Sequence, residues 1–192
     1  MAASPLPTRL TPEEYLAIER EAEFKSEYYD GQMFAMSGGS LPHSVLPARL
    51  TAALSRSVRA RGCEVTNSEL RVRVTPRGPF FYPDISIYCG EPQLADDYRD
   101  VLLNPLVVIE VLSKSTEAHD RGFKFDAYRK IESLQEYVLV SQKEPHMEVY
   151  LRQPQGKWLL SHYVGMDAVC VFSSLDCSVR LSDVYEGLKL GD

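Results

Sequence analysis

The sequence lacks the long apolar segments that characterise membrane and exported proteins. Within its 192 residues, no apolar run approaches the roughly 20 residues that a membrane helix needs. The N-terminus also lacks the apolar core of a secretory signal peptide. We therefore expect no membrane association and a cytoplasmic location.

Cysteine is scarce and scattered. The four cysteines stand at positions 63, 89, 170 and 177, with no C-x-x-C pair and no histidine at the spacing of a zinc finger. Such spacing argues against a disulfide framework and against a structural zinc site. A reducing cytoplasm is accordingly the expected environment.

Internal repeats, low-complexity segments and domain linkers are also absent from the sequence. Apolar residues make up 44% and charged residues 25% of the chain, which is ordinary for a globular protein. A chain of this length can bury a sizeable core. We expect a single domain over residues 1–192, with residues 1–9 flexible.

The chain has no overall excess of basic residues, since its formal net charge is −6. Residues 41–80 are nevertheless basic, with seven Arg and two Glu, whereas residues 81–120 hold eight acidic and two basic side chains. This pattern fits either a phosphate-binding flank beside a cation site or a solvated helix face and a charged edge strand. On the first interpretation the nucleic-acid contacts come from Arg49, Arg56, Arg59, Arg71 and Arg73.

Periodicity and capping signals predict an α+β fold. Thr11, Pro12 and Glu14 form the capped start of a helix that runs to about Glu21. Helices packed on a mixed sheet of about five to eight strands are expected overall. The other predicted elements are a hairpin around Asp30-Gly31, helices near 42–60 (with Pro47 unfavourable inside), 116–131 and 181–188, and strands near 63–68, 70–76, 80–89, 105–115, 136–142, 146–153 and 157–165.

Two acidic residues stand inside apolar runs. Asp84 follows Pro83 in FFYPDISIYC, and Glu110 lies in the middle of PLVVIEVLSKS. If these strands are neighbours, both carboxylates reach one point on the same face, where Mg²⁺ would offset their repulsion. The alternatives are that Asp84 caps a strand or turn and that Glu110 pairs with a buried arginine.

A lysine near the two carboxylates would complete a hydrolytic site. Position 112, on the face of Glu110, is Leu, and Lys114 falls where the strand should end. The following segment HDRGFKFDAYRK places Asp120 and Lys124 on one helical face, four residues apart. Lys124 can therefore return over the carboxylates, although an isolated lysine of this kind is usually a surface residue.

These residues together resemble a known family. YPD at 82–84, VVIEVLSKST at 107–116, DRGFKFDAYRK at 120–130 and EYVLV at 136–140 are similar to the Uma-two family of restriction-endonuclease-like proteins, within the PD-(D/E)XK nuclease superfamily. The resemblance extends upstream to FKSEYYDGQMFAM at 24–36 and covers roughly residues 10–188. It implies a restriction-endonuclease-like core and Mg²⁺- or Mn²⁺-dependent hydrolysis of phosphodiester bonds.

The resemblance also implies roles for individual residues. Asp84 matches the aspartate of PD and Glu110 the acidic residue of (D/E)XK, so both are expected to bind the metal. The lysine of that motif is replaced by Leu112, and Lys124 stands at the position to which the family moves it. Lys124 would position or deprotonate the attacking water, and a base role would need a lowered pKa. Possible accessory residues are Glu27, His43 and Asp120.

The predicted function is therefore a metal-dependent endonuclease that acts on nucleic acid, with DNA expected and a homodimer suited to cutting both strands. One alternative is a catalytically inactive nuclease-fold module that binds a partner and no divalent ion. Another is a carboxylate-pair hydrolase such as a glycosidase, which needs no metal. His119, His146 and His162 fall on predicted loops and strand edges and receive no role.

Overall fold

In the computed structural model of the chain, residues 9–190 are described. The prediction that residues 1–9 are flexible falls almost entirely outside this range. Helix α1 spans Pro12–Glu21, as predicted, and Thr11 and Glu14 form the expected capping box. Strands β1 (Ser26–Tyr29) and β2 (Gln32–Ala35) follow as an antiparallel hairpin around Asp30-Gly31. Both turn residues have positive φ, which Asp tolerates and Gly adopts readily.

Helix α2 spans Leu41–Arg59 and includes Pro47, so the expected helix forms despite this residue. Its apolar side chains recur about every four residues and form one buried face. A positive φ at Gly62 follows the helix end, where an L side chain would be strained. The buried residues of the helix are Pro42, Leu46, Leu50, Leu54 and Val58.

The central sheet is mixed and has six strands in the order β11-β10-β9-β8-β6-β3. Within this sheet only β8 and β9 pair in parallel, because the helical segment after β8 returns the chain to the same end of the sheet. The prediction of a mixed sheet of this size is confirmed. Its strands are β3 (Cys63–Asn67), β6 (Ile85–Cys89), β8 (Val107–Leu112), β9 (Glu136–Ser141), β10 (His146–Arg152) and β11 (Trp158–Val164).

The prediction of one continuous strand over residues 80–89 was wrong. The segment forms β5 (Phe80–Phe81) and β6, which belong to different sheets and are separated by Tyr82-Pro83-Asp84. Pro83 has no N–H to donate to a ladder, so the strand breaks there. The other sheet has the order β2-β1-β5-β4-β7, with β4 at Arg71–Arg73 and β7 at Val101–Leu102.

The short elements complete the fold. The helix expected near 116–131 consists of α3 (Glu117–His119), a π-helical turn over Asp120–Lys124, and α4 (Phe125–Tyr128). Near the C-terminus, β12 (Val169–Phe172) and β13 (Cys177–Arg180) form an unpredicted hairpin before α5 (Leu181–Tyr185). The remaining single turns of 3₁₀-helix span Pro154–Gly156 and Ser173–Leu175.

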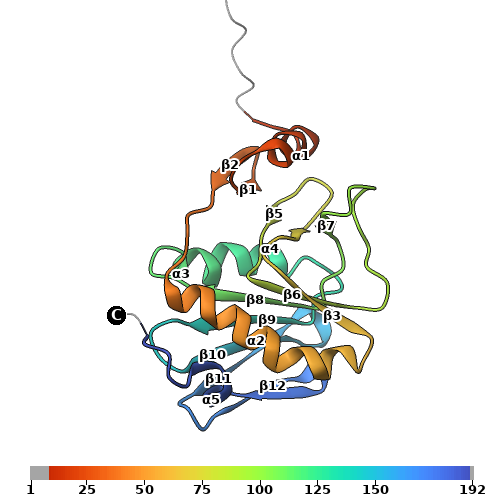
Figure 1. Cartoon of the computed structure of the whole chain (residues 1–192). Helices are drawn as coiled ribbons and strands as arrows, with labels where there is room; N and C mark the ends of the chain where they lie inside the picture. The colour runs from red at the N-terminus through yellow and green to blue at the C-terminus, as the bar shows by residue number, and fades with distance from the viewer. Residues whose placement is uncertain (1–8, 191–192) are drawn as a thin grey trace, which may run out of the picture.

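The central sheet separates two apolar cores. Alternate residues of β8 face opposite sides, so Val107, Ile109 and Val111 pack with α2, whereas Val108 and Leu112 pack with α4. Figure 1 shows α2 across one face of the sheet and the α3–α4 segment on the other. Glu110 therefore points to the face that α3 and α4 cover.

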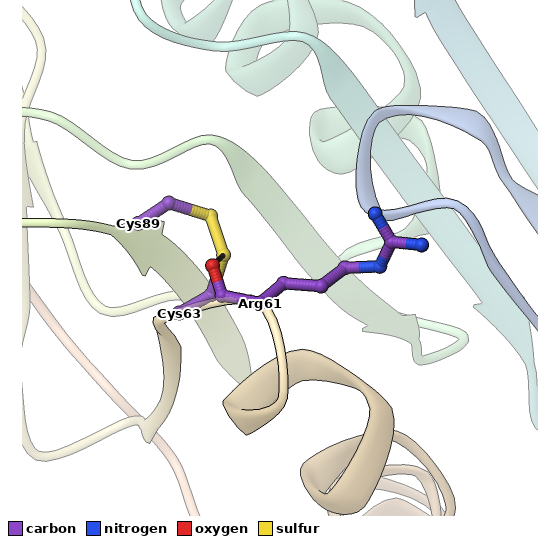
Figure 2. The surroundings of a disulfide bond; sticks show 3 residues. All are labelled: Arg61, Cys63 and Cys89. Atoms are coloured by element: carbon purple, nitrogen blue, oxygen red, sulfur yellow. Dashed lines mark hydrogen bonds between the residues drawn. A yellow bond between two sulfur atoms is a disulfide. The ribbon is translucent and has the colours of Figure 1, made fainter.

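One disulfide joins two strands of the central sheet, which corrects the expectation from cysteine spacing. Cys63 and Cys89 lie directly opposite each other in the antiparallel β3–β6 pair and are bonded through sulfur (Figure 2). Their 26-residue separation gives no hint of this contact, because strand register creates it. The expected cytoplasmic location therefore no longer rests on the cysteines, of which Cys170 and Cys177 are free.

Across residues 9–190, every helix is too short or too polar to cross a bilayer.

Candidate active site

Strand pairing brings the two predicted carboxylates together. In the antiparallel β6–β8 pair, Ile85 lies opposite Ile109, so the preceding Asp84 reaches the level of Glu110. The backbone N–H of Val111 donates to Asp84 Oδ2 at 2.7 Å. The break at Pro83 thus places Asp84 just before the first residue of β6, beside the middle of the completely buried strand β8.

Lys124 reaches the same point from the π-helical turn. Its Nζ lies 3.1 Å from Glu110 Oε1, 2.9 Å from Glu27 Oε1 and 3.6 Å from Asp120 Oδ1. Asp120 and Lys124 are both buried on the side of the turn that faces the sheet. Asp120 and Lys124, four residues apart, therefore lie on one face of the turn, as the sequence predicted.

The accessory residues lie at the same site but come from other elements. Glu27 belongs to β1, and its Oε1 accepts the backbone N–H of Tyr82 at 3.2 Å as well as Lys124. His43 lies in the first turn of α2, with Nε2 3.8 Å from Asp84 Oδ2. The five-stranded sheet, the central sheet, α2 and the α3–α4 segment therefore all contribute to one cluster.

The cluster lines a cavity of about 910 Å³. This volume lies in the range of about 300–1,000 Å³ that is usual for ligand sites. The cavity wall also includes Lys114, Lys143 and Gln142, and Gln142 Nε2 donates to the carbonyl of Leu112 at 2.9 Å. All six predicted catalytic and accessory residues line it: Glu27, His43, Asp84, Glu110, Asp120 and Lys124.

Burial raises the pKa of the Glu110 carboxyl well above its usual range, although the Lys124 ammonium opposes the shift. Burial also raises the pKa of Asp84, against the lowering effects of His43 and the Val111 N–H. Both carboxyls are thus harder to ionise than ordinary ones. A second positive charge at the site would lower the pKa of both carboxyls and favour their ionised forms.

The pKa of Lys124 moves in the direction opposite to that required of a base. Burial lowers it, but the carboxylates of Glu110, Glu27 and Asp120 raise it by more, so the net shift is upward. Lys124 is therefore held as an ammonium ion. The lowered pKa expected for a base is not found, because three neighbouring carboxylates contact this one lysine and stabilise its charged form.

Tyr128 is a further contact of Glu110 that received no role from the sequence. Its hydroxyl donates to Glu110 Oε1 at 3.2 Å, the same oxygen that Lys124 contacts. Tyr128 lies four residues after Lys124, and this spacing is the signal that places it on the same face. Its burial raises the pKa of the phenol well above the usual value, so it remains a donor.

The Uma2 family model, described as "Putative restriction endonuclease", matches residues 12–181. This chain belongs to the Uma2 family. The match covers every residue of the cluster, from Glu27 to Lys124. The family expected from the sequence motifs is therefore confirmed.

Two relatives of the Uma2 chain come from Synechocystis sp. (strain ATCC 27184 / PCC 6803 / Kazusa). "Uncharacterized protein slr1290" is 37% identical over 191 residues, which cover 97% of this chain and 96% of the relative. "Uncharacterized protein sll1609" is 34% identical over 164 residues, which cover 85% and 93%. The similarity thus extends over nearly the whole length of each protein.

A solved structure confirms the fold of the Uma2 chain. The crystal structure of a putative nuclease belonging to DUF820 from Anabaena variabilis ATCC 29413 matches with a TM-score of 0.74 at 21% sequence identity. The match covers 92% of this chain and 97% of the other. The mixed α+β, restriction-endonuclease-like architecture is accordingly shown.

Two of the five arginines predicted to contact nucleic acid form contacts within the protein. Arg71 is buried and forms an ion pair with Asp100. Arg49 Nη1 donates to the carbonyl oxygens of Val184 (3.0 Å) and Glu186 (2.8 Å), at the end of α5. These contacts engage Nη2 of Arg71 and Nη1 of Arg49, and the expectation that the two arginines contact nucleic acid stays a prediction.

The other three arginines differ in exposure. Arg56 and Arg59 are exposed on the last turns of α2, and Arg59 Nε lies 3.8 Å from Glu64 Oε1. Arg73 is half-buried in β4. Arg56 and Arg59 are therefore the arginines of this set whose exposure suits phosphate contacts.

Proposed function

We propose that this Uma2 protein is a Mg²⁺- or Mn²⁺-dependent endonuclease that hydrolyses phosphodiester bonds in DNA. The observation that carries the proposal is the convergence of Asp84, Glu110 and Lys124 in one cavity. Family membership supports the same activity, since the family is described as "Putative restriction endonuclease". The fold alone would not separate a nuclease from other functions.

The donor atoms at the site suit a hard divalent cation. Three carboxylates, from Glu27, Glu110 and Asp120, lie within 4 Å of Lys124 Nζ. A fourth, from Asp84, lines the same cavity. No donor within residues 9–190 forms a hydrogen bond with Asp84 Oδ1 or Glu110 Oε2. Each of these two carboxylates therefore has one oxygen available for another ligand. Oxygen ligands with excess negative charge are those that Mg²⁺ and Mn²⁺ prefer.

In this proposal Asp84 and Glu110 hold the cation. Such a cation supplies Lewis-acid polarisation of a phosphate oxygen and lowers the pKa of a bound water. Tyr128 and Lys124 donate to Glu110 Oε1 and thereby fix the orientation of its carboxyl group.

Lys124 acts in this scheme as a fixed positive charge. Because its pKa is raised, it would orient the attacking water and offset charge on the phosphate, without accepting a proton. Glu27 and Asp120 hold the ammonium in place. Because Lys124 Nζ lies 3.1 Å from Glu110 Oε1, its positive charge would stand beside the proposed metal-binding pair.

DNA as the substrate and a homodimer as the active form are parts of the proposal. The exposed Arg56 and Arg59 on α2 and the cavity lysines Lys114 and Lys143 support binding to a polyanion. Two copies would let one complex cut both strands. Gel filtration with light scattering, with and without duplex DNA, measures whether the protein is a dimer.

Cleavage of nucleic acid tests the proposal. Supercoiled plasmid, single-stranded DNA, branched DNA and RNA are incubated with the protein in Mg²⁺, in Mn²⁺ and in EDTA, beside the Asp84→Asn variant. We expect cleavage of DNA in either metal, none in EDTA, and at least a hundredfold slower cleavage by the variant, in line with the loss of an electrostatic catalytic group.

The matched control is Asp97→Asn, which removes an exposed carboxylate from the loop before β7. It should cleave at the wild-type rate. Cleavage by Asp84→Asn at that same rate would refute the assignment. Absence of cleavage on every substrate would favour the inactive binding module, a reading that the buried Leu112 at the usual lysine position supports.

A further inference from the structure

A second group of ionisable side chains lies on the β10–β11 hairpin, outside the lining of the carboxylate cavity. Glu148 of β10 is directly opposite His162 of β11. His146 precedes Glu148 by two residues, so it points to the same face of the sheet. Strand register therefore gathers two imidazoles and one carboxylate that the sequence keeps apart.

The ligand atoms of the three residues face one another. His146 Nε2 lies 3.2 Å from His162 Nδ1 and 3.7 Å from Glu148 Oε1, and His162 Nδ1 lies 4.0 Å from the same oxygen. Ligands at about 2.0–2.1 Å in a tetrahedral zinc site are separated by about 3.4 Å. The three atoms thus stand close to the spacing that one metal ion imposes.

Glu148 is oriented by contacts that leave this oxygen available. Its side chain is only 6% exposed, and its other oxygen, Oε2, accepts a hydrogen bond from Arg121. Arg121 is itself held by Glu117, with Nε 3.0 Å from Glu117 Oε1. A partner that fixes the outer oxygen of a carboxylate is the usual support of a metal ligand.

The two histidines differ in exposure but both reach solvent. The side chain of His146 is 18% exposed and that of His162 is 51% exposed. An ion can therefore enter from the His162 side, whereas Glu148 closes the buried side. The rings are stacked with centroids 5.4 Å apart, which keeps the two nitrogens on one side.

We propose that His146, Glu148 and His162 bind a first-row transition-metal cation of the Zn²⁺ class, with a non-protein ligand such as water in the fourth position. Two imidazole nitrogens and one carboxylate oxygen favour Zn²⁺ over Mg²⁺, which takes oxygen ligands. This site is distinct from the carboxylate site in its residues and in its metal. It requires no nuclease activity.

Zinc titration by calorimetry tests the site. The full chain carries Asp84→Asn, so that the carboxylate cavity contributes less binding, and is titrated with Zn²⁺ alone. We expect one equivalent to bind. The added substitution His162→Gln, and separately His146→Gln, should weaken binding at least about tenfold, since even the loss of an outer partner costs 10–100-fold.

His119→Gln in the same background is the matched control, because it removes another exposed imidazole outside the cluster. It should leave the affinity for Zn²⁺ unchanged. Circular dichroism verifies that each variant is folded. Retention of the Zn²⁺ affinity of the Asp84→Asn parent after either His162→Gln or His146→Gln would overturn the proposal. The absence of Zn²⁺ binding to that parent would overturn it too.

Discussion

Glu110 is a buried acid in the middle of a buried strand, and its contacts explain how the strand tolerates it. Lys124 and Tyr128 both donate to its Oε1. An unpaired carboxylate in such a place costs several kcal/mol. The alternative that Glu110 pairs with a buried arginine is wrong, because its partner is a lysine. The same lysine also contacts Glu27 and Asp120, so negative charge remains in excess.

Lys124→Met is expected to lower the free energy of unfolding by about 3–5 kcal/mol at pH 7, because it leaves buried carboxylates without their cation. Urea denaturation in EDTA measures this loss. The difference should narrow at pH 5, where the carboxyls are protonated more readily. Lys114→Met, at an exposed lysine of the same cavity, should change the stability by less than about 0.5 kcal/mol. Equal effects of the two substitutions would contradict the account.

Glu136 is another buried acid, on the face of the central sheet opposite to that of Glu110. Its Oε1 accepts the backbone N–H of Ser174 at 2.7 Å, and its Oε2 has no partner among the described residues. Burial raises the pKa of this carboxyl, against the lowering effect of the Ser174 N–H. The folded protein therefore holds this proton more tightly than the unfolded chain.

The raised pKa of Glu136 makes the protein less stable at high pH. Because the folded-state pKa is the higher one, Glu136 lowers the free energy of unfolding as the pH rises from about 4.3, the ordinary Glu value, through the folded-state pKa. Glu136→Gln should remove this loss and be more stable than wild type by roughly 1 kcal/mol at pH 8. Denaturation curves at several pH values measure it, with the exposed Glu132→Gln as control. Parallel pH profiles of wild type and Glu136→Gln would refute the assignment.

At the scale of the element, local signals were predictable and partner contacts were not. Helix α1 begins and ends where the sequence indicates, because capping involves residues three apart. The common face of Asp120 and Lys124 also follows from spacing alone. The π-helical turn that carries them could not be foreseen, since it depends on packing against the sheet.

Three short strands escaped prediction for a physical reason. β7, β12 and β13 are too short for an alternating pattern to be recognised. The break at Pro83 was missed because the apolar run continues across it. The Cys63–Cys89 bond and the His146–Glu148–His162 cluster both depend on strand register, which a single sequence does not reveal.

The disulfide is expected to contribute to the stability of the β3–β6 pair. Closing a loop of 26 residues restricts the unfolded chain by about 3–4 kcal/mol in the chain-entropy description. A reductant should lower the free energy of unfolding of the wild type by up to that amount and leave Cys63→Ala/Cys89→Ala unaffected. Cys177→Ala, at a free cysteine, should respond like wild type. A wild type that does not respond to reductant would contradict the expectation.

At the scale of the whole molecule, the site lies where the two larger sheets meet. β5 and β6 belong to different sheets, and Tyr82-Pro83-Asp84 joins them. Glu27 comes from β1 of the five-stranded sheet and Glu110 from β8 of the central sheet. Lys124 comes from the π-helical turn between α3 and α4. Family membership and fold were predictable from the motifs. The contact of Arg49 with Val184 and the ion pair of Arg71 with Asp100 were not, because they depend on the tertiary structure.

The central claim is that Asp84 and Glu110 hold a divalent cation, and Mn²⁺ titration by calorimetry tests it most directly. The His162→Gln protein is used as the parent, so that the hairpin cluster does not contribute. We predict one Mn²⁺ per chain, at least about tenfold weaker binding after Asp84→Asn, and unchanged binding after Asp97→Asn. Equal Mn²⁺ affinity in the parent and in Asp84→Asn would contradict the claim and with it the proposed metal-dependent nuclease.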